Sequence, residues 1–537
     1  MYGKLNSACL YGIDGVLIEV ETDLSNGLPQ TSIIGLPDSA IREAVERVRA
    51  AIKNCGFKYP SQRVTINLAP ADLRKEGSSF DLAIAIGLLT ASAQIILPSE
   101  EKTMFIGELA LDGSLRSVNG VLSMVDLAKR EGFDSVMLPW ENGQEARLVR
   151  GIRVYGVRHL KDMIPPASIN LTQKPEGGET ARPPVRVESL DHLLLNEQVL
   201  MVSEDGDDAP PGRALEDYAD VLGQQHAKRA LVIAASGMHN ILLIGPPGTG
   251  KTMLIRRLPT IMPKLEEAEA LEVTKILSAA GKLKESASGL IRTRPFRAPH
   301  HTISSGGLIG GGAIPKPGEV SLAHRGVLFL DELPEFNRQV LEVLRQPLED
   351  KQVTISRARA VFTYPAQFLL AGSMNPCYCG WYGSETDVQR CTCSPRRIVH
   401  YRSRISGPML DRIDLQLEVP RPREWQQEQA SISSEEMRRQ VLTAQAVQAE
   451  RYRELPISWN SELSGALLRR FCKMEPRAHT LLQQTVEALG LSMRSYDRIL
   501  KLSRTIADLA GADQIGMEHT AEAIQYRKLD MKNMSSN

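Results

Sequence analysis

The run at residues 245–252, Gly-Pro-Pro-Gly-Thr-Gly-Lys-Thr, constrains this chain more than any other feature, because it matches the phosphate-loop pattern G-x-x-x-x-G-K-[ST] at every position. The apolar run 240–244 predicts a buried parallel strand before the loop, and residues 252–258 predict a helix after it. Backbone N–H groups of such a loop surround a polyphosphate at the positive end of a helix. A chance glycine-rich turn would lack these flanking elements, so we predict a domain that binds and hydrolyses a nucleoside triphosphate.

The residues of this loop have distinct expected contacts. Lys251 is expected to contact the β- and γ-phosphates, and the Thr252 hydroxyl is expected to bind Mg²⁺. ATP and Mg²⁺ are therefore the predicted ligands. The predicted nucleotide contacts in the loop are Gly245, Pro246, Pro247, Gly248, Thr249, Gly250, Lys251 and Thr252.

A second apolar run, residues 326–330, ends in Asp331 and Glu332. The carboxyl end of a strand in a parallel sheet faces the ligand crevice. We expect Asp331 to hold Mg²⁺, directly or through water, and Glu332 to polarise the attacking water as a general base. Taken alone, the pattern fits a strand that ends in a solvated acidic turn equally well. The phosphate loop upstream favours the catalytic interpretation.

A third apolar run, residues 368–374, ends in Asn375. An amide between the acidic strand and the γ-phosphate can orient the attacking water. A turn-forming asparagine before a proline is the alternative interpretation.

The composition limits which classes of function are compatible with the chain. Its 537 residues carry 64 Lys and Arg against 64 Asp and Glu, so any nucleic-acid contact must come from local patches. The longest apolar stretch, residues 83–93, is too short to span a bilayer, so no membrane partner is expected. The N-terminal residues lack the apolar region of a secretory signal, and the cysteines are grouped rather than spread as in a disulfide framework. We therefore expect a cytoplasmic protein.

Composition and hydrophobic periodicity predict four parts along the chain. Residues 1–163 alternate strand-like and helical runs and predict an α/β domain. Residues 164–213 form a linker that is rich in proline, glycine and acidic residues and contains a plausible short helix. Residues 214–425 form the nucleotide-binding α/β core, and residues 426–537 are helical throughout.

Four cysteines form two Cys-x-Cys pairs soon after the third apolar run. Four thiolates suit a closed tetrahedral zinc site of the structural kind, and the glycines between the pairs permit the tight backbone that such a site needs. Free thiols remain the alternative, because Cys-x-Cys is a less usual spacing than Cys-x-x-Cys. The predicted zinc ligands are Cys377, Cys379, Cys391 and Cys393.

With these motifs in place, residues 214–530 resemble the AAA+ ATPases, specifically their magnesium-chelatase-like branch. Gln224, in the segment Asp-Val-Leu-Gly-Gln, resembles the box on the adenine side of the nucleotide, and Asn375 resembles sensor 1. Arg494, in Leu-Ser-Met-Arg-Ser-Tyr-Asp-Arg, resembles the sensor 2 arginine of the helical lid. The resemblance implies that Gln224 lies at the nucleotide and that Arg494 contacts the γ-phosphate.

Arg412, in Gly-Pro-Met-Leu-Asp-Arg-Ile-Asp, resembles the arginine finger of this branch, which projects into the site of the neighbouring subunit. Arg404 is a rival candidate. A finger supplied in trans requires a closed ring, and the family implies a homo-hexamer. Without this context, Arg404, Arg412 and Arg494 would each be interpreted as surface or ion-pair residues.

Two further segments of the core resemble features of ring-shaped DNA motors. The glycine-rich segment 296–319 predicts a flexible protrusion and resembles the helix 2 insertion of the branch. Residues 345–359 predict a helix end followed by a β-hairpin that carries Lys351, Arg357 and Arg359. In related motors such hairpins touch DNA phosphates, which implies sequence-independent, salt-sensitive contacts. A solvated charged hairpin is the alternative.

The N-terminal 160 residues resemble the proteolytic domain of Lon, whose fold is related to ribosomal protein S5 domain 2. Lon uses a Ser–Lys dyad. Ser79 occupies the position of the nucleophile, but Phe80 and Asp81 replace the expected Ala-Gly, and Met124 stands where the lysine belongs. A thioether cannot accept a proton, so we expect a non-proteolytic binding or ring-organising module. Lys75 is the only substitute base that we consider.

Over nearly its whole length the chain resembles the ComM/YifB family, because it combines the Lon-like domain, the AAA+ core, the two cysteine pairs and the helical lid. This resemblance implies a hexameric motor that drives DNA branch migration during recombination in natural transformation, with DNA and recombination proteins as partners. A chelatase-like ATPase that remodels a protein partner is the alternative. An ATP-dependent Ser–Lys protease is disfavoured by Met124.

Overall fold

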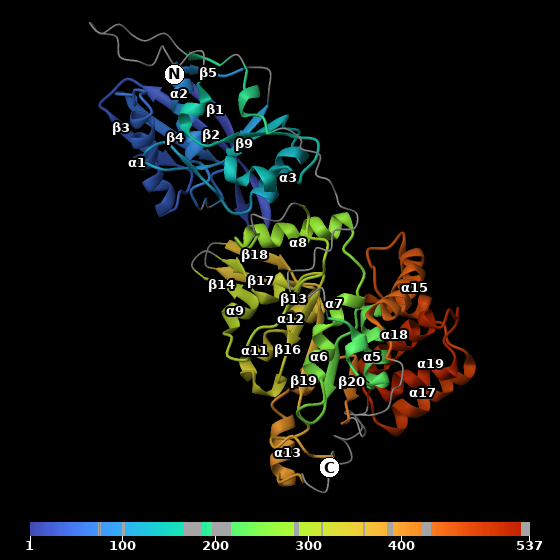
Figure 1. Cartoon of the computed structure of the whole chain (residues 1–537). Helices are drawn as coiled ribbons and strands as arrows, with labels where there is room; N and C mark the ends of the chain where they lie inside the picture. Colours follow the sequence, from blue (N-terminus) through green and yellow to red (C-terminus); the bar gives the residue numbers. More distant parts are fainter. Residues whose placement is uncertain are drawn as a thin grey trace. The chain divides into compact units, whose positions relative to one another are not determined.

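The computed structural model of the chain divides into two compact units. The first comprises Met1–Gly206 and Leu271–Ile291, and the second comprises Asp207–Ala270 and Arg292–Asn537, so the division falls inside helix α8 (Glu267–Ala279). The regions predicted as nucleotide-binding core and helical lid lie together in the second unit, except for Leu271–Ile291, which the predicted core included and which belongs to the first unit. Figure 1 labels elements of both units. The structure describes residues 1–73, 75, 77–98, 102–164, 185–187, 189–195, 216–283, 289–312, 315–357, 360–383, 390–421 and 431–527.

The first unit is built on a seven-stranded sheet in the order β10-β9-β6-β1-β2-β4-β3. Strands β1 and β2 form an antiparallel hairpin, and β4 continues the antiparallel pairing on the far side of β2. Strands β1, β6, β9 and β10 are parallel to one another. This confirms the predicted α/β organisation of the N-terminal region. The strands are β1 (Tyr2–Tyr11), β2 (Asp14–Ser25), β3 (Gln30–Ile34), β4 (Arg63–Ala69), β6 (Thr103–Phe105), β9 (Ser135–Pro139) and β10 (Arg153–Val157).

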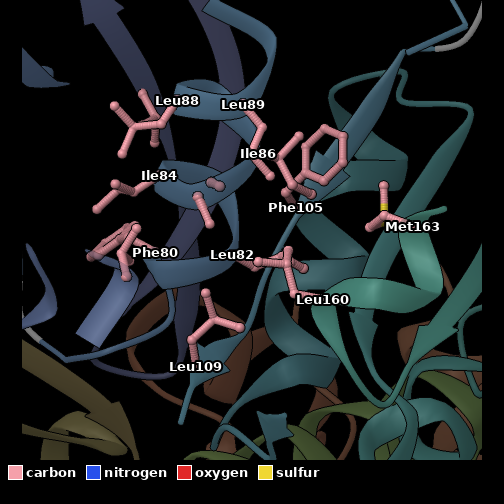
Figure 2. Close-up of a cluster of buried hydrophobic side chains, with 14 of the residues drawn as sticks. Phe80, Leu82, Ile84, Ile86, Leu88, Leu89, Phe105, Leu109, Leu160 and Met163 are labelled. Carbon is pink, nitrogen blue, oxygen red and sulfur yellow. The ribbon is translucent and has the colours of Figure 1, made fainter. Parts of the chain in front are cut away.

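Both faces of this sheet are covered by helices, because successive residues of a strand point to opposite sides. In β1, Cys9 belongs to the hydrophobic cluster that includes α1 and α2, whereas Ala8 belongs to the cluster that includes α3. Figure 2 shows apolar side chains of α2, such as Leu82, beside Phe105 and Leu160. The helices are α1 (Ser39–Asn54), α2 (Asp81–Ala91), α3 (Val121–Arg130) and α4 (Gly143–Ala146).

Two short ribbons accompany this sheet. Strand β7 (Glu108–Leu109) pairs with β8 (Leu115–Arg116), and β5 (Ile95–Ile96) pairs with β11 (Val185–Arg186). Strand β11 lies within the predicted linker 164–213, most of which is outside the described residues, as is most of its predicted short helix.

The second unit contains a fully parallel five-stranded sheet in the order β13-β16-β19-β12-β20. Every residue of β12, β16 and β19 is buried, which explains why these strands read as continuous apolar runs rather than as alternating patterns. The three strands predicted from those runs are thus confirmed. The elements around the phosphate loop are β12 (Ile241–Ile244), β13 (Phe296–Arg297), β16 (Val327–Leu330), β19 (Leu369–Met374), β20 (Leu415–Glu418), α5 (Gln225–Gly237), α6 (Lys251–Arg256) and α7 (Leu258–Ile261).

The C-terminal region is helical, as predicted, and shares one hydrophobic cluster with the sheet of the second unit. Trp459 and Ile506 of this region join the same buried cluster as Ile241 of β12. The long helix α15 (Ser434–Tyr452) begins at Ser433, whose side chain accepts a hydrogen bond from the Glu436 N–H. The other helices are α16 (Gly465–Phe471), α17 (Pro476–Ala488), α18 (Met493–Leu509) and α19 (Met517–Gln525).

The predicted hairpin after the acidic strand is present as β17 (Gln352–Arg357) and β18 (Ala360–Pro365), which pair antiparallel. The glycine-rich segment contains more regular structure than the predicted flexible protrusion. It forms α9 (Ser305–Ile309) and the ribbon of β14 (Gly310–Gly311) with β15 (Lys316–Pro317). The remaining α-helices are α10 (Glu319–Leu322), α11 (Arg338–Glu342), α12 (Arg345–Asp350), α13 (Pro395–Arg402) and α14 (Gly407–Leu410). Among the described residues, no helix combines the length and apolarity needed to cross a membrane.

Candidate nucleotide-binding site

The phosphate loop, the two acids and Asn375 converge because they follow three neighbouring strands of one parallel sheet. Strand β19 lies between β12 and β16, so the chain that leaves it at Asn375 emerges between the phosphate loop and Asp331. The carboxyl ends of parallel strands share one edge of a sheet, and ligands bind there.

Lys251 lies inside the phosphate loop rather than in solvent. Its Nζ donates to the Gly245 carbonyl at 2.7 Å and the Pro246 carbonyl at 2.9 Å, and it reaches Asn375 Oδ1 at 3.3 Å. Burial lowers the pKa of Lys251, and the negative charges of Asp331 and Glu332 oppose that change. The ammonium is thus held by weak neutral acceptors at the place where phosphate oxygens would serve as stronger, charged ones.

The backbone of the loop is shaped for this purpose. Gly250 precedes α6 with φ of 82°, a left-handed conformation that strains other residues, and Gly248 has φ of 79°. Thr249 closes the loop by donating from its hydroxyl to the Pro246 carbonyl at 3.0 Å.

Thr252 and Asp331 form the predicted pair of magnesium ligands. The Thr252 hydroxyl donates to Asp331 Oδ2 at 3.0 Å, so one hydroxyl and one carboxylate oxygen already face each other. Oxygen donors of this kind suit Mg²⁺, and the residues present fit that ion.

Ser373 is a member of the site that the sequence reasoning missed. Its hydroxyl donates to Asp331 Oδ1 and accepts the Glu332 N–H at 3.3 Å, so it connects both acids to β19. A single hydroxyl in the otherwise apolar, buried strand Leu369–Met374 is the signal that could have revealed it.

Glu332 leaves the strand in an unusual conformation. Its φ is 54°, in the left-handed region that is costly for a residue with a side chain, and its side chain is exposed to solvent. Such backbone strain occurs often at functional sites, where it aims a side chain. An exposed carboxylate beside the magnesium ligands has access to water, as a general base requires.

Gln224 lies beside the phosphate loop, although it is distant in sequence. Its Nε2 donates to the Pro420 carbonyl at 2.8 Å. The preceding residue, Val419, donates its N–H to Ile244 at the end of β12. The predicted adenine-side residue is therefore tied to the strand that leads into the loop.

The two candidate arginine fingers have different environments. Arg412 was predicted to project from the subunit, but only 6% of its side chain is exposed, and it pairs with Glu349 and donates to the Pro408 carbonyl at 2.6 Å. It lines a surface cavity of about 730 Å³. Arg404 is 41% exposed and pairs with the exposed Glu335 at 2.9 Å.

Arg494 lies in the first turn of the lid helix α18 and is exposed. Its positive charge is one of those that lower the pKa of Arg412, after burial, the largest cause. The structure therefore places the sensor 2 candidate within electrostatic reach of the finger candidate.

The predicted DNA contacts are only partly described. Lys351 is at the base of the hairpin, where it ends α12 with φ of 57°, and burial lowers its pKa, with Glu462 and Asp414 opposing. Burial disfavours the charged form of an ammonium, and a contact between Lys351 and DNA phosphates stays a prediction. Arg357 ends β17, but its side chain is outside the described residues, as is Arg359.

The four cysteines form one cluster. Their sulfur atoms all lie within 4.8 Å of one another; Cys377 and Cys391 are 3.8 Å apart, and Cys379 and Cys391 are 3.6 Å apart. All four are free thiols. A tetrahedral zinc ion with zinc–sulfur distances of about 2.3 Å places its sulfurs about 3.8 Å apart, so the donor set fits zinc.

The dyad candidates of the first unit are engaged internally. The buried Ser79 hydroxyl donates to the Ala8 carbonyl at 3.1 Å, and Lys75, which is fully buried, donates to the Pro70 carbonyl. Met124 belongs to the hydrophobic cluster that includes α3. These contacts agree with the interpretation that the unit has no Ser–Lys dyad.

Comparison with known proteins extends over nearly the whole chain. Three family models match: "Subunit ChlI of Mg-chelatase" over residues 20–142, "Magnesium chelatase, subunit ChlI" over 217–427, and "Magnesium chelatase, subunit ChlI C-terminal" over 431–527. The competence protein ComM of Haemophilus influenzae is 43% identical over 96% of both chains. The uncharacterized protein YifB of Escherichia coli is 41% identical over 97% of this chain and 96% of its own length. Lon protease 2 of Bacillus subtilis is 26% identical over 32% of this chain and 34% of its own.

Proposed function

Because this chain belongs to the ComM/YifB family of magnesium-chelatase-like AAA+ proteins, we propose that it is an ATP-driven motor that migrates DNA branches during recombination in natural transformation. The observation that carries the ATPase part is the convergence of Lys251, Thr252, Asp331 and Asn375 at one edge of a parallel sheet. The DNA part is supported by the similarity to a competence protein.

Hydrolysis of ATP at this site divides among a few side chains. Lys251 exchanges its carbonyl acceptors for the β- and γ-phosphate oxygens, and Thr252 and Asp331 hold the magnesium ion, which neutralises charge on the phosphates. Glu332 accepts a proton from the attacking water, and Asn375 orients that water. Ser373 orients the Asp331 carboxylate, to which it donates, and holds the backbone of Glu332 by accepting its N–H.

A closed homo-hexamer completes each site with an arginine from the neighbouring subunit. Arg412 serves this role by exchanging Glu349 for a phosphate of the neighbour, and it lines a cavity through which a neighbour can reach it. Arg404 is the alternative, since it is exposed without any rearrangement. Arg494, whose charge contributes to lowering the pKa of Arg412, supplies a second cation for the γ-phosphate.

The other parts of the chain have supporting roles in this proposal. The first unit is a Lon-like module without proteolytic activity, because Met124 stands where the catalytic lysine of Lon belongs. The four cysteines hold a structural zinc ion. The β17–β18 hairpin contacts DNA phosphates through Arg357 and Arg359, and the protein acts in the cytoplasm with recombination proteins as partners.

The deciding experiment is a steady-state ATPase assay without DNA, with single-stranded DNA and with a four-way junction, at low and moderate salt. Phosphate contacts release counterions, so stimulation by DNA should weaken as salt rises. Strong, salt-sensitive stimulation supports the motor and leads to a strand-exchange assay with Lys251→Ala as the inactive control. If the ATPase rate of an assembled enzyme is unchanged by every DNA, the proposed DNA motor is contradicted.

The second candidate is a chelatase-like ATPase that remodels a protein partner. The match of three magnesium-chelatase family models favours it. It predicts ATP turnover that is indifferent to DNA, so the same assay separates the two candidates.

A further inference from the structure

The cysteine loop, residues 376–383 and 390–394, lies directly against the nucleotide site. It begins one residue after Asn375, and Cys377 is completely buried. An ideal Cβ on Gly380 would lie 2.7 Å from Cδ of Pro247 in the phosphate loop. The backbone of the cysteine loop therefore packs on the phosphate loop at a separation that only glycine permits.

A second set of contacts joins this loop to the sensor strand. The hydroxyl of the buried Tyr401, in α13, lies close to the Asn375 backbone, which opposes the rise that burial causes in the Tyr401 pKa. The Tyr401 ring packs on Tyr378 with centroids 4.7 Å apart. Arg402 Nε donates to the Pro376 carbonyl at 3.3 Å. Helix α13 itself begins at Ser394, directly after Cys393. The cysteine cluster thus lies between Asn375 and α13, the helix that carries Tyr401 and Arg402.

A third contact reaches the strand exit near Gln224. The guanidinium of Arg421 lies over the Trp381 ring, 4.4 Å from its centroid. The neighbouring Pro420 accepts the hydrogen bond from Gln224. The cysteine loop therefore touches the surroundings of the phosphate loop, of Asn375 and of Gln224.

From this packing we infer that the metal-loaded cysteine cluster is a positioning element of the nucleotide site, so that loss of the metal weakens ATP binding. This inference rests on the nucleotide site of the proposed function and deepens it. Without a metal, no bond joins the four sulfur atoms, and the loop loses the tether that keeps Gly380 against Pro247. The phosphate loop then loses one wall, and Asn375 loses its support from Tyr401.

The sharpest test compares two glycines of the same loop. Gly380 and Gly383 have φ of 85° and 76°, so alanine strains both positions similarly, but among the described residues the new Cβ meets another atom within 4 Å only at Gly380. We expect Gly380→Ala to raise the Kd of a fluorescent ATP analogue about tenfold, with one zinc retained per subunit. Gly383→Ala should leave the Kd near the wild-type value. Equal Kd values for the two variants would overturn the inference.

The metal itself is tested by releasing zinc with a mercurial reagent in the absence of DNA. Zinc released per subunit, by a colorimetric assay, should track the loss of analogue binding, and added thiol with zinc should restore both. Unchanged affinity after complete release would overturn the inference.

Tyr401→Phe keeps the thiols and should weaken binding of the ATP analogue less than Gly380→Ala. Because these assays contain no DNA, they stand even if the DNA part of the proposed function fails; a wild-type chain that binds no analogue refutes both.

Discussion

Each compact unit contains a buried lysine that donates to backbone carbonyls, yet the surroundings of the two lysines differ. Lys75 in the first unit donates to the Pro70 carbonyl, and the nearby Ser79 donates to the Ala8 carbonyl, so both groups form hydrogen bonds within the fold. Lys251 in the second unit also donates to carbonyls, but it shares its site with Asn375 and two acids. Burial lowers the pKa of both lysines. A buried lysine thus indicates chemistry only where a ligand can replace its acceptors.

The largest effect should come from removing the second lysine. Lys251→Ala removes the one cation of the phosphate loop itself, residues 245–252, so we expect the Kd for ATP to rise at least about 100-fold, or about 2.7 kcal/mol. Lys75→Met should leave that Kd within about twofold. Calorimetric titration of both folded variants measures the difference. Retained ATP binding by Lys251→Ala would remove the phosphate loop as the site.

Glu332→Gln should separate binding from chemistry. The amide keeps the shape of the side chain but cannot take a proton, so turnover should fall by about 10²–10⁴-fold while ATP binding persists. Phosphate release measures the turnover and equilibrium titration measures the ATP binding, both on the same preparation. Unchanged turnover would exclude Glu332 as the base.

Mixed rings test which arginine acts in trans. Subunits with Arg412→Ala keep an intact phosphate loop, and subunits with Lys251→Ala keep an intact finger, so mixtures should recover part of the ATPase activity that either variant lacks alone. The same mixture with Arg404→Ala is the matched control. If activity recovers only in the mixture of Arg404→Ala with Lys251→Ala subunits, Arg404 is the finger. If activity recovers in neither mixture, the result argues against a finger in trans.

Ser373→Ala should have a smaller effect than Glu332→Gln. It removes the hydroxyl that connects Asp331 and Glu332, and the loss of one such hydrogen bond to a charged group is worth about 1.5–3 kcal/mol. We expect a lower kcat and a higher Mg²⁺ concentration at half-maximal turnover, measured by titrating Mg²⁺ at saturating ATP. A wild-type magnesium profile would show that Ser373 only packs in the strand.

The centre of the nucleotide site could be predicted from the sequence because each part is local. The loop 245–252, the pair Asp331 and Glu332, and Asn375 each follow a continuous apolar run, and such runs are typical of strands buried on both faces. Once three such strands are parallel neighbours, their ends must meet. No arrangement of distant side chains was needed for that inference.

Other properties depend on contacts between distant segments, and the sequence could not predict them. Arg412, which follows α14, is buried and pairs with Glu349 of α12. Lys351 is partly buried, and the charges that affect its pKa belong to the lid and to Asp414, which directly precedes β20. The fit of Gly380 against Pro247 likewise depends on how two loops pack. Motif resemblance assigned roles to Arg412 and Lys351 without information on these partners.

The smallest effect should come from Ser79→Ala, which tests the first unit directly. If Ser79 were a nucleophile, the variant would abolish a casein-digesting activity of the wild-type chain. Because its hydroxyl is already committed to the Ala8 carbonyl, we expect no digestion by either chain, unchanged ATP turnover, and about 1 kcal/mol lower stability from the lost hydrogen bond. Thermal unfolding and a casein assay with ATP measure these outcomes. Digestion by the wild type that Ser79→Ala removes would show that the hydroxyl can leave its carbonyl, and the contrast between the two lysines would then fail, since Lys75 is the nearest candidate base in the sequence.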